Sequence, residues 1–154
     1  MAKSDNLDFP CLAYASRRTS RAVSNFFNAQ MKPLDLNVAQ FGLLATVARL
    51  PGRSLSAIGE SMLLDESTLA RNLAVLEKRG LIASEGGRGR GGKQVSLSAE
   101  GETLFVDAAR IWKRANIRLA AEMPPDQVEA GRVFLKSLSD ASERLRQKDE
   151  ASGD

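Results

Sequence analysis

Apolar residues in the first third of the chain repeat every three or four positions, as they do on one face of a helix. Residues 12–26 follow this period and predict a first helix, which Pro33 should end. Asn37 is a good N-cap for a second helix, because its side chain can accept a hydrogen bond from the first turn. The apolar positions of residues 38–48 keep the same period, and Pro51 should close this helix.

The next segment predicts two short helices joined by a tight turn. The first covers residues 55–62, and the second ends near Arg79 with Gly80 behind it, where a left-handed C-cap is favoured. Asp65 and Ser67 are both suitable N-caps for the second helix. Two such helices, of which the second is longer and polar on one side, are typical of a helix-turn-helix.

Beyond this motif the pattern changes to that of short strands. Residues 81–85 and 93–97 predict two strands, and their connection, residues 86–92, contains five glycines together with Arg88 and Arg90. Since its only larger side chains are cationic, this hairpin is typical of a wing that contacts DNA phosphates.

Two further helices are predicted in the last third of the chain. Ser98 can cap the first, whose apolar stripe covers residues 104–115, and Pro124 and Pro125 break the chain before the second. The apolar period of the second helix continues to Leu145. The whole pattern predicts a mostly α fold with a small two-stranded β-wing, in a single domain.

Composition narrows the class of protein. Hydrophobic residues make up 43% of the 154 positions and charged residues 27%, as in ordinary globular proteins, and the net charge of +3 says little about partners. No segment has the character of a signal peptide or a membrane span. We therefore expect a cytoplasmic protein that has no membrane partner.

The cysteine and histidine counts argue against catalysis and metal binding. One cysteine cannot form an internal disulfide, and the absence of histidine removes the commonest general base and excludes a zinc finger. The glycine-rich connection lacks the strand-loop-helix context of a phosphate-binding loop. We expect no catalytic residues, no metal and no cofactor.

Three segments carry a resemblance to a known family. They are LNVAQFGLL at 36–44, LARNLAVLEKRGLI at 69–82 and VSLSAEGETL at 95–104. In their order of elements, residues 11–146 resemble the MarR family of bacterial regulators. The resemblance implies a single MarR-like domain over residues 1–154, with a winged helix-turn-helix lobe at about 36–98 and dimerisation helices at about 10–32 and 99–147.

The resemblance also implies a function. It implies a homodimer that binds a palindromic operator in double-stranded DNA and acts as a repressor, which a small-molecule effector releases. MarR-like wings usually carry an Asp two residues before the Arg at the tip, and this wing has none. Which wing arginine enters the minor groove therefore stays open.

The candidate DNA contacts lie on the recognition helix and the wing. They are Ser67, Thr68, Arg71 and Asn72 on the helix and Arg88, Arg90 and Lys93 on the wing. Arginine can pair with guanine and asparagine with adenine, so the helix has suitable chemistry for base readout. The plain alternative is a solvated surface that binds nothing, and the position between a short helix and a wing favours DNA. Lys78 and Arg79 fit dipole compensation as well as phosphate contact.

An effector cleft is implied, by the resemblance alone, between the dimer helices and the winged lobe. Its candidate residues combine cations with apolar walls and are Arg17, Arg18, Phe26, Phe41 and Trp112. Such a lining suits a small anionic aromatic molecule. The alternative is that each of these residues belongs to the ordinary core or surface.

Cys11 offers a different trigger. In the organic-hydroperoxide branch of the family a lone reactive cysteine stands at the start of the first helix, and residues 9–14 look similar. That branch surrounds the thiol with tyrosines, whereas Tyr14 is the only tyrosine here, which favours a non-redox role.

The rival to a DNA-binding regulator comes from another functional class. It is a winged-helix module that binds protein partners and has no operator.

Overall fold

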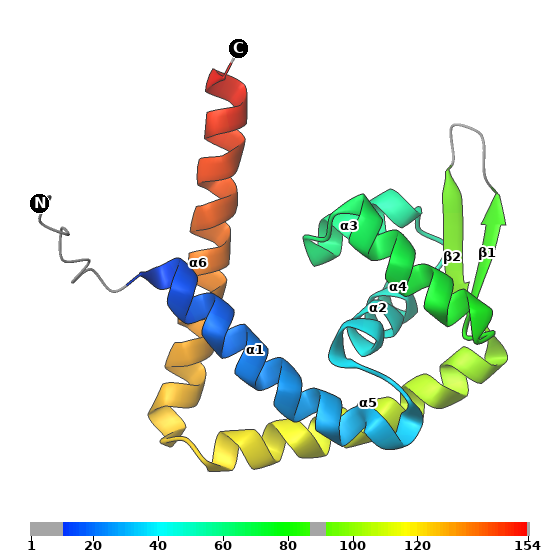
Figure 1. Ribbon diagram of the computed structural model, residues 1–154, viewed down its shortest axis with the longest axis horizontal. Coiled ribbons are helices and arrows are strands. Elements are labelled where there is room, and N and C mark those ends of the chain that lie inside the picture. Colours follow the sequence, from blue (N-terminus) through cyan, green and yellow to red (C-terminus); the bar gives the residue numbers. More distant parts are fainter. Residues whose placement is uncertain (1–10, 87–91, 154) are drawn as a thin grey trace, which may run out of the picture. The chain divides into compact units, whose positions relative to one another are not determined.

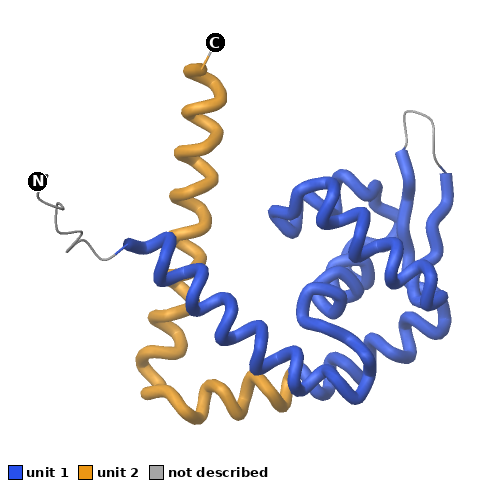
Figure 2. The backbone as a smooth tube through the Cα atoms, viewed as in Figure 1, with its two compact units in different colours: residues 1–112 blue, residues 113–154 orange. Residues whose placement is uncertain are grey.

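The computed structural model describes residues 11–86 and 92–153. Along the chain they form α1 (Leu12–Met31), the 3₁₀ turn η1 (Lys32–Leu34), α2 (Val38–Arg49), α3 (Leu55–Met62), α4 (Glu66–Lys78), β1 (Ile82–Gly86), β2 (Lys93–Leu97), α5 (Ala99–Ala121) and α6 (Pro125–Ser152) (Figure 1). The predicted mostly α fold with a two-stranded wing is confirmed. The chain divides into two compact units, Met1–Trp112 and Lys113–Asp154 (Figure 2).

Helices α2 and α3 of the first unit each begin at a residue whose side chain accepts a hydrogen bond from the first turn. The Asn37 side chain accepts a 2.8 Å hydrogen bond from the Gln40 N–H, and the Gln40 side chain accepts one of 3.0 Å from the Asn37 N–H. This reciprocal capping box stabilises the start of α2. Ser54 caps α3 through a single hydrogen bond that its hydroxyl accepts from the Ala57 N–H.

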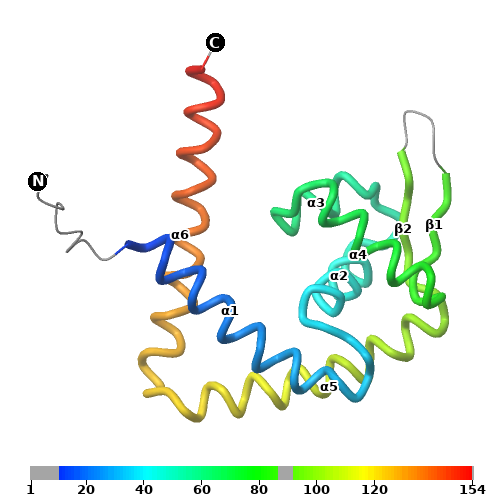
Figure 3. Tube along the Cα trace, viewed as in Figure 1, coloured from blue at the N-terminus to red at the C-terminus, as the bar shows by residue number. Residues whose placement is uncertain are grey.

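The core of the first unit lies around α2. Helix α2 contacts α3, α4 and β2, and Figure 3 shows these elements gathered beside the two strands. The fully buried side chains include Met31, Leu43, Leu44, Val47, Ile58, Leu76 and Val95. They come from the apolar faces of five elements, so the helix-turn-helix and the base of the wing share one core.

The wing is a short antiparallel ladder. Strand β1 pairs with β2 in the register Ile82↔Leu97 to Gly86↔Lys93, so β1 begins one residue later than the predicted 81–85. The connection between α2 and α3 extends the ladder, because the Val95 N–H donates to the Arg53 carbonyl at 3.3 Å. Side-chain periodicity carries no signal for this third segment, since a single bridge imposes no alternation on the sequence.

Helix α5 begins against the turn that leads into the wing. The Ser98 hydroxyl donates to the Gly80 carbonyl at 2.6 Å and accepts from the Gly101 N–H at 2.9 Å, which confirms the predicted cap. A Cβ atom on Gly101 would lie 1.9 Å from the Leu81 carbonyl oxygen. Only glycine therefore permits this close approach of helix and turn.

The second unit contains the end of α5 and helix α6. The predicted helix ended near residue 147, and this was wrong, because α6 continues to Ser152. Ion pairs of Arg146 with Glu143 at 2.9 Å and Glu150 at 2.6 Å continue along the helix after the apolar pattern stops. Of the helices in the described ranges, none combines the length and apolar character needed to cross a bilayer.

Candidate nucleic-acid interface

The N-terminus of α4 is organised around the carboxylate of Asp65. Its Oδ1 accepts hydrogen bonds from the Ser67 hydroxyl at 2.6 Å and the Thr68 N–H at 2.8 Å, and its Oδ2 accepts from the Thr68 hydroxyl at 2.8 Å. The hydrogen bond from Ser67, followed by those from Thr68, holds the pKa of Asp65 far below its usual range. Asp65, not Ser67, is therefore the N-cap of α4.

The remaining predicted helix contacts extend this cluster by one turn. The Arg71 guanidinium donates to the Thr68 hydroxyl at 3.2 Å, and the Asn72 side-chain amide donates to the Thr68 carbonyl at 3.0 Å. Ser67 and Arg71 are exposed, and Thr68 and Asn72 are half-buried. The structure thus brings all four predicted residues together, with Asp65 as the organising group that sequence reasoning took for a cap alone.

The turn between α3 and α4 is tight. Leu63 ends α3 in the left-handed region at φ 52°, and the Leu64 N–H donates to the Gly59 carbonyl at 3.1 Å. A Cβ atom on Gly59 would lie 2.9 Å from a methyl group of Leu69. This close approach fixes the angle at which α4 leaves the turn, and so the direction of its N-terminal face.

The wing residues are only partly described. Arg88 and Arg90 lie outside the described residues and stay predictions. Lys93 begins β2, and its Nζ lies 2.7 Å from Oε1 of Glu77 on α4. Contact of Lys93 with DNA also stays a prediction.

Arg79 has a structural role at the other end of α4. Its guanidinium donates to the carbonyls of Leu34 at 3.1 Å and Asp35 at 2.5 Å, which lie between α1 and α2. Arg79 therefore links the end of the recognition helix to a segment more than forty residues earlier. The sequence suggested only dipole compensation or phosphate contact, because partners so distant leave no trace in local pattern.

This lobe has a winged helix-turn-helix fold. It combines two short helices, a tight turn between them, a polar second helix and a wing, all built on one core. Residues 34–91 match the model of the MarR family. The matched residues hold the helix-turn-helix and the first strand of the wing. The chain therefore carries the winged-helix region of a MarR-family DNA-binding transcription regulator, and that family is non-enzymatic. None of the curated protein sequences matches the chain significantly.

Solved structures agree with the family assignment. The MosR regulator of M. tuberculosis, in complex with DNA, is 25% identical with a TM-score of 0.77, and the match covers 88% of this chain and 98% of that one. The PcaV regulator of Streptomyces coelicolor with its natural ligand is 23% identical with a TM-score of 0.76, covering 92% and 99%. The S. aureus MepR–DNA complex is 17% identical with a TM-score of 0.71, covering 84% and 95%. The last two show the shared MarR fold.

The predicted effector residues are distributed over several places in the first unit. The ring centroids of Phe41 and Trp112 are 6.0 Å apart, and Phe41 is also stacked on Phe105. Phe26 contacts Phe27 edge-on at 5.3 Å. Arg17 lines a hollow of about 410 Å³ on α1 with Ser16, Ser20 and Arg21, whereas Arg18 does not line it. The structure thus brings Phe41 and Trp112 together.

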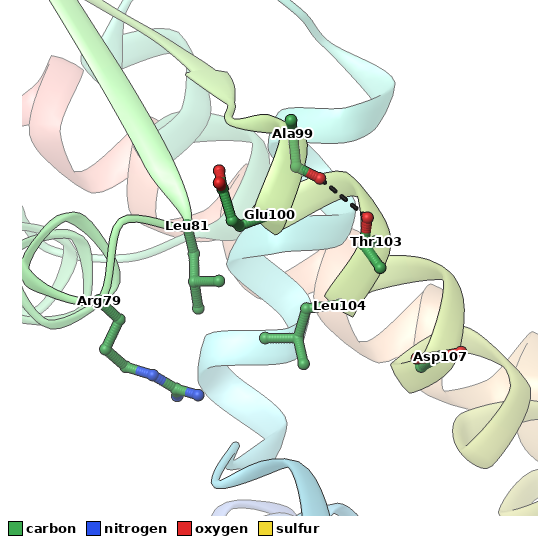
Figure 4. A pocket seen from close by; sticks show the side chains of 7 residues that line it. All are labelled: Arg79, Leu81, Ala99, Glu100, Thr103, Leu104 and Asp107. Carbon is green, nitrogen blue, oxygen red and sulfur yellow. Dashed lines mark hydrogen bonds between the residues drawn. The ribbon is translucent and has the colours of Figure 1, made fainter.

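A second hollow, of about 490 Å³, lies beside the start of α5. Its lining residues are Arg79, Leu81, Ala99, Glu100, Thr103, Leu104 and Asp107 (Figure 4). It contains none of the five predicted effector residues, so the effector cleft stays a prediction.

Cys11 is exposed and has a local structural role. It is the N-cap of α1, and its Sγ accepts a hydrogen bond of 3.4 Å from the Tyr14 N–H. The redox role of Cys11 stays a prediction.

Proposed function

We propose that this MarR-family regulator is a homodimeric repressor that binds an inverted-repeat operator through α4 and the wing and is released by a small anionic aromatic effector. The observation that carries the DNA-binding part is the ordered polar N-terminus of α4. There a single carboxylate, Asp65, holds Ser67 and Thr68, and Thr68 in turn holds Arg71 and Asn72.

Such order favours readout of bases. A recognition helix that fixes its side chains before binding loses less conformational entropy on contact with DNA. Arg71 then presents guanidinium donors for a guanine, and Asn72 is suited to an adenine. Arg88 and Arg90 supply phosphate contacts in this proposal, on the grounds given by the sequence.

Exposed apolar side chains support the dimer. On α1, Leu12 and Tyr14 are 51% and 65% exposed, and on α6, Phe134 and Leu145 are 54% and 61% exposed. A winged lobe needs neither set for its own core, since the buried cluster is complete without them. Burial of both sets between two subunits would be favoured by about 25 cal/mol for each Å² of apolar surface removed from water.

The effector part of the proposal has a narrower basis. The tilted pair of Phe41 and Trp112 offers an aromatic surface, of which Trp112 is 42% exposed, and Arg17 offers a cation on α1. PcaV, a protein of the same fold, was solved with its natural ligand. An aromatic anion would match an aromatic surface and a guanidinium.

The decisive experiment is selection of genomic fragments bound by the purified protein, followed by titration of the recovered operator and a scrambled duplex of equal length. We expect a preference for the operator and an inverted repeat within it. A protein-interaction module would bind both duplexes alike. Sedimentation at micromolar concentration should show a dimer, and monomer alone would refute that part.

The same titration tests the redox alternative. Peroxide should release the operator from the wild type and not from Cys11→Ser if the thiol is the trigger. Because Cys11 serves as a cap and Tyr14 is the only tyrosine in the chain, we expect both proteins to be equally insensitive.

A further inference from the structure

The wing carries polar side chains on the face that it turns to the protein core. Ser84 is paired directly with Val95 in the ladder, and side chains alternate along a strand, so Ile82, Ser84, Val95 and Lys93 share one face. This face is apolar at Ile82 and Val95, which are 4% and 1% exposed. It becomes polar at Ser84, beside Val95, and at Lys93 one step further out, while Glu85 lies on the opposite, exposed face.

One carboxylate of the recognition helix meets both polar positions. Oε1 of Glu77 lies 2.7 Å from Nζ of Lys93 on β2 and accepts a hydrogen bond from the Ser84 hydroxyl on β1. Partial burial alone raises the pKa of Glu77, but the hydrogen bonds from Lys93 and Ser84 and the charge of Lys93 outweigh it, so that the pKa is lowered. The contact therefore joins an ionised carboxylate to both strands of the wing.

We propose that Glu77 is a positioning residue for DNA binding, which fixes the wing to the recognition helix through Ser84 and Lys93 without touching DNA. The inference rests on the proposed function, in which α4 and the wing contact the same operator. Nearer the base of the wing, α4 and the strands are held together by apolar packing. The Glu77 contact adds a restraint further along the strands, so its loss would let the wing tilt against α4.

The sign of the effect separates this role from plain electrostatics. DNA is a polyanion, so removal of a carboxylate near the interface should strengthen binding if charge alone matters. Loss of the tether should weaken binding in spite of that gain. Glu85→Ala is the matched control, because it also removes one carboxylate close to the wing, but from the exposed face of β1 that does not meet Glu77.

The experiment compares Glu77→Ala, Glu85→Ala and the reversed pair Glu77→Lys with Lys93→Glu, in the full-length protein. The single variants are titrated with the selected operator at several salt concentrations. We expect Glu77→Ala to bind about tenfold more weakly with a salt slope lower by about one, and Glu85→Ala to bind as tightly as the wild type or more tightly. The reversed pair tests the contact between α4 and the wing through wing mobility and not through affinity, because Lys93 is itself a candidate DNA contact and its replacement removes a cation from the interface.

A spin label at Gln94→Cys, in a Cys11→Ser background, reports on the wing without DNA. Its spectrum should become more mobile in Glu77→Ala and return toward the wild type in the reversed pair. An unchanged spectrum, or unchanged operator affinity despite a more mobile wing, would overturn the proposal. If the wild type shows no preference for the operator over a scrambled duplex, the proposed function fails, and the spectra still decide whether Glu77 holds the wing.

Discussion

Substitution of Gly101 by alanine should destabilise the winged lobe severely. The added Cβ would meet the Leu81 carbonyl oxygen at 1.9 Å and the Leu81 carbonyl carbon at 2.9 Å. Backbone atoms cannot rotate away as a side chain can, so α5 or the turn before β1 must move by about 1 Å to reach an ordinary contact. That movement would also strain the hydrogen bonds of Ser98 to the carbonyls of Gly80 and Leu81.

The magnitude follows from opposing contributions. Alanine in place of glycine favours a helix by about 1 kcal/mol, whereas overpacking against a fixed backbone costs about 3 kcal/mol or more. We expect a net loss of about 2 to 4 kcal/mol. Two other helical glycines calibrate the result, since a Cβ on Gly42 would lie 3.6 Å from the flexible end of Met62 and one on Gly59 would lie 2.9 Å from a methyl group of Leu69.

Urea denaturation of the three alanine variants measures how each substitution changes the free energy of unfolding. Gly42→Ala should raise the free energy of unfolding by up to about 1 kcal/mol, Gly59→Ala should lower it slightly, and Gly101→Ala should lower it most. If Gly101→Ala is as stable as Gly42→Ala, then α5 does not approach Leu81 as closely as described, and the argument from backbone contact fails.

Three further outcomes are expected. Arg71→Ala should cost about 1 to 3 kcal/mol at the operator and little on a scrambled duplex, whereas loss of both Arg88 and Arg90 should weaken both duplexes and lower the salt slope by about one to two; titrations showing the reverse would refute these assignments. Because the folded-state pKa of Asp65 is depressed, its stabilisation is complete above its ordinary value of 3.8 and is lost as the pH falls below it, so urea midpoints of wild type and Asp65→Asn should converge in acid. Leu63→Gly should raise the unfolding temperature by relieving about 1 kcal/mol of strain at φ 52°, because the 60% exposed side chain packs little; a lower temperature would contradict this.

The helix boundaries were predictable because their signals are local. Asn37, Ser54 and Ser98 each cap a helix through a backbone N–H three residues later, and that spacing is visible in the sequence. The clustering of Ser67, Thr68, Arg71 and Asn72 follows from the same local geometry, since residues three and four apart share a helix face.

The contacts that orient these elements were not predictable in the same way. Arg79 meets carbonyls 44 and 45 residues earlier, and Gly101 lies against the carbonyl of Leu81 in the turn before β1. Partners of this kind depend on the packed fold and leave no period in the sequence. Helix α6 shows a related difference, because its last turns follow charge pairs at Arg146 after its apolar pattern has ended.

The two ends of the recognition helix have different roles, and this affects how the operator preference of such a regulator can be changed. Its first turns, residues 67–72, hold the polar side chains of the candidate interface. Glu77 in its last turn attaches it to the wing, and its C-cap Arg79 attaches it to the segment between α1 and α2. Transplanting only residues 67–72 from another family member should therefore transfer operator preference while the docking angle is retained. A graft of the whole helix would replace both the candidate base-reading residues and the contacts that set the docking angle.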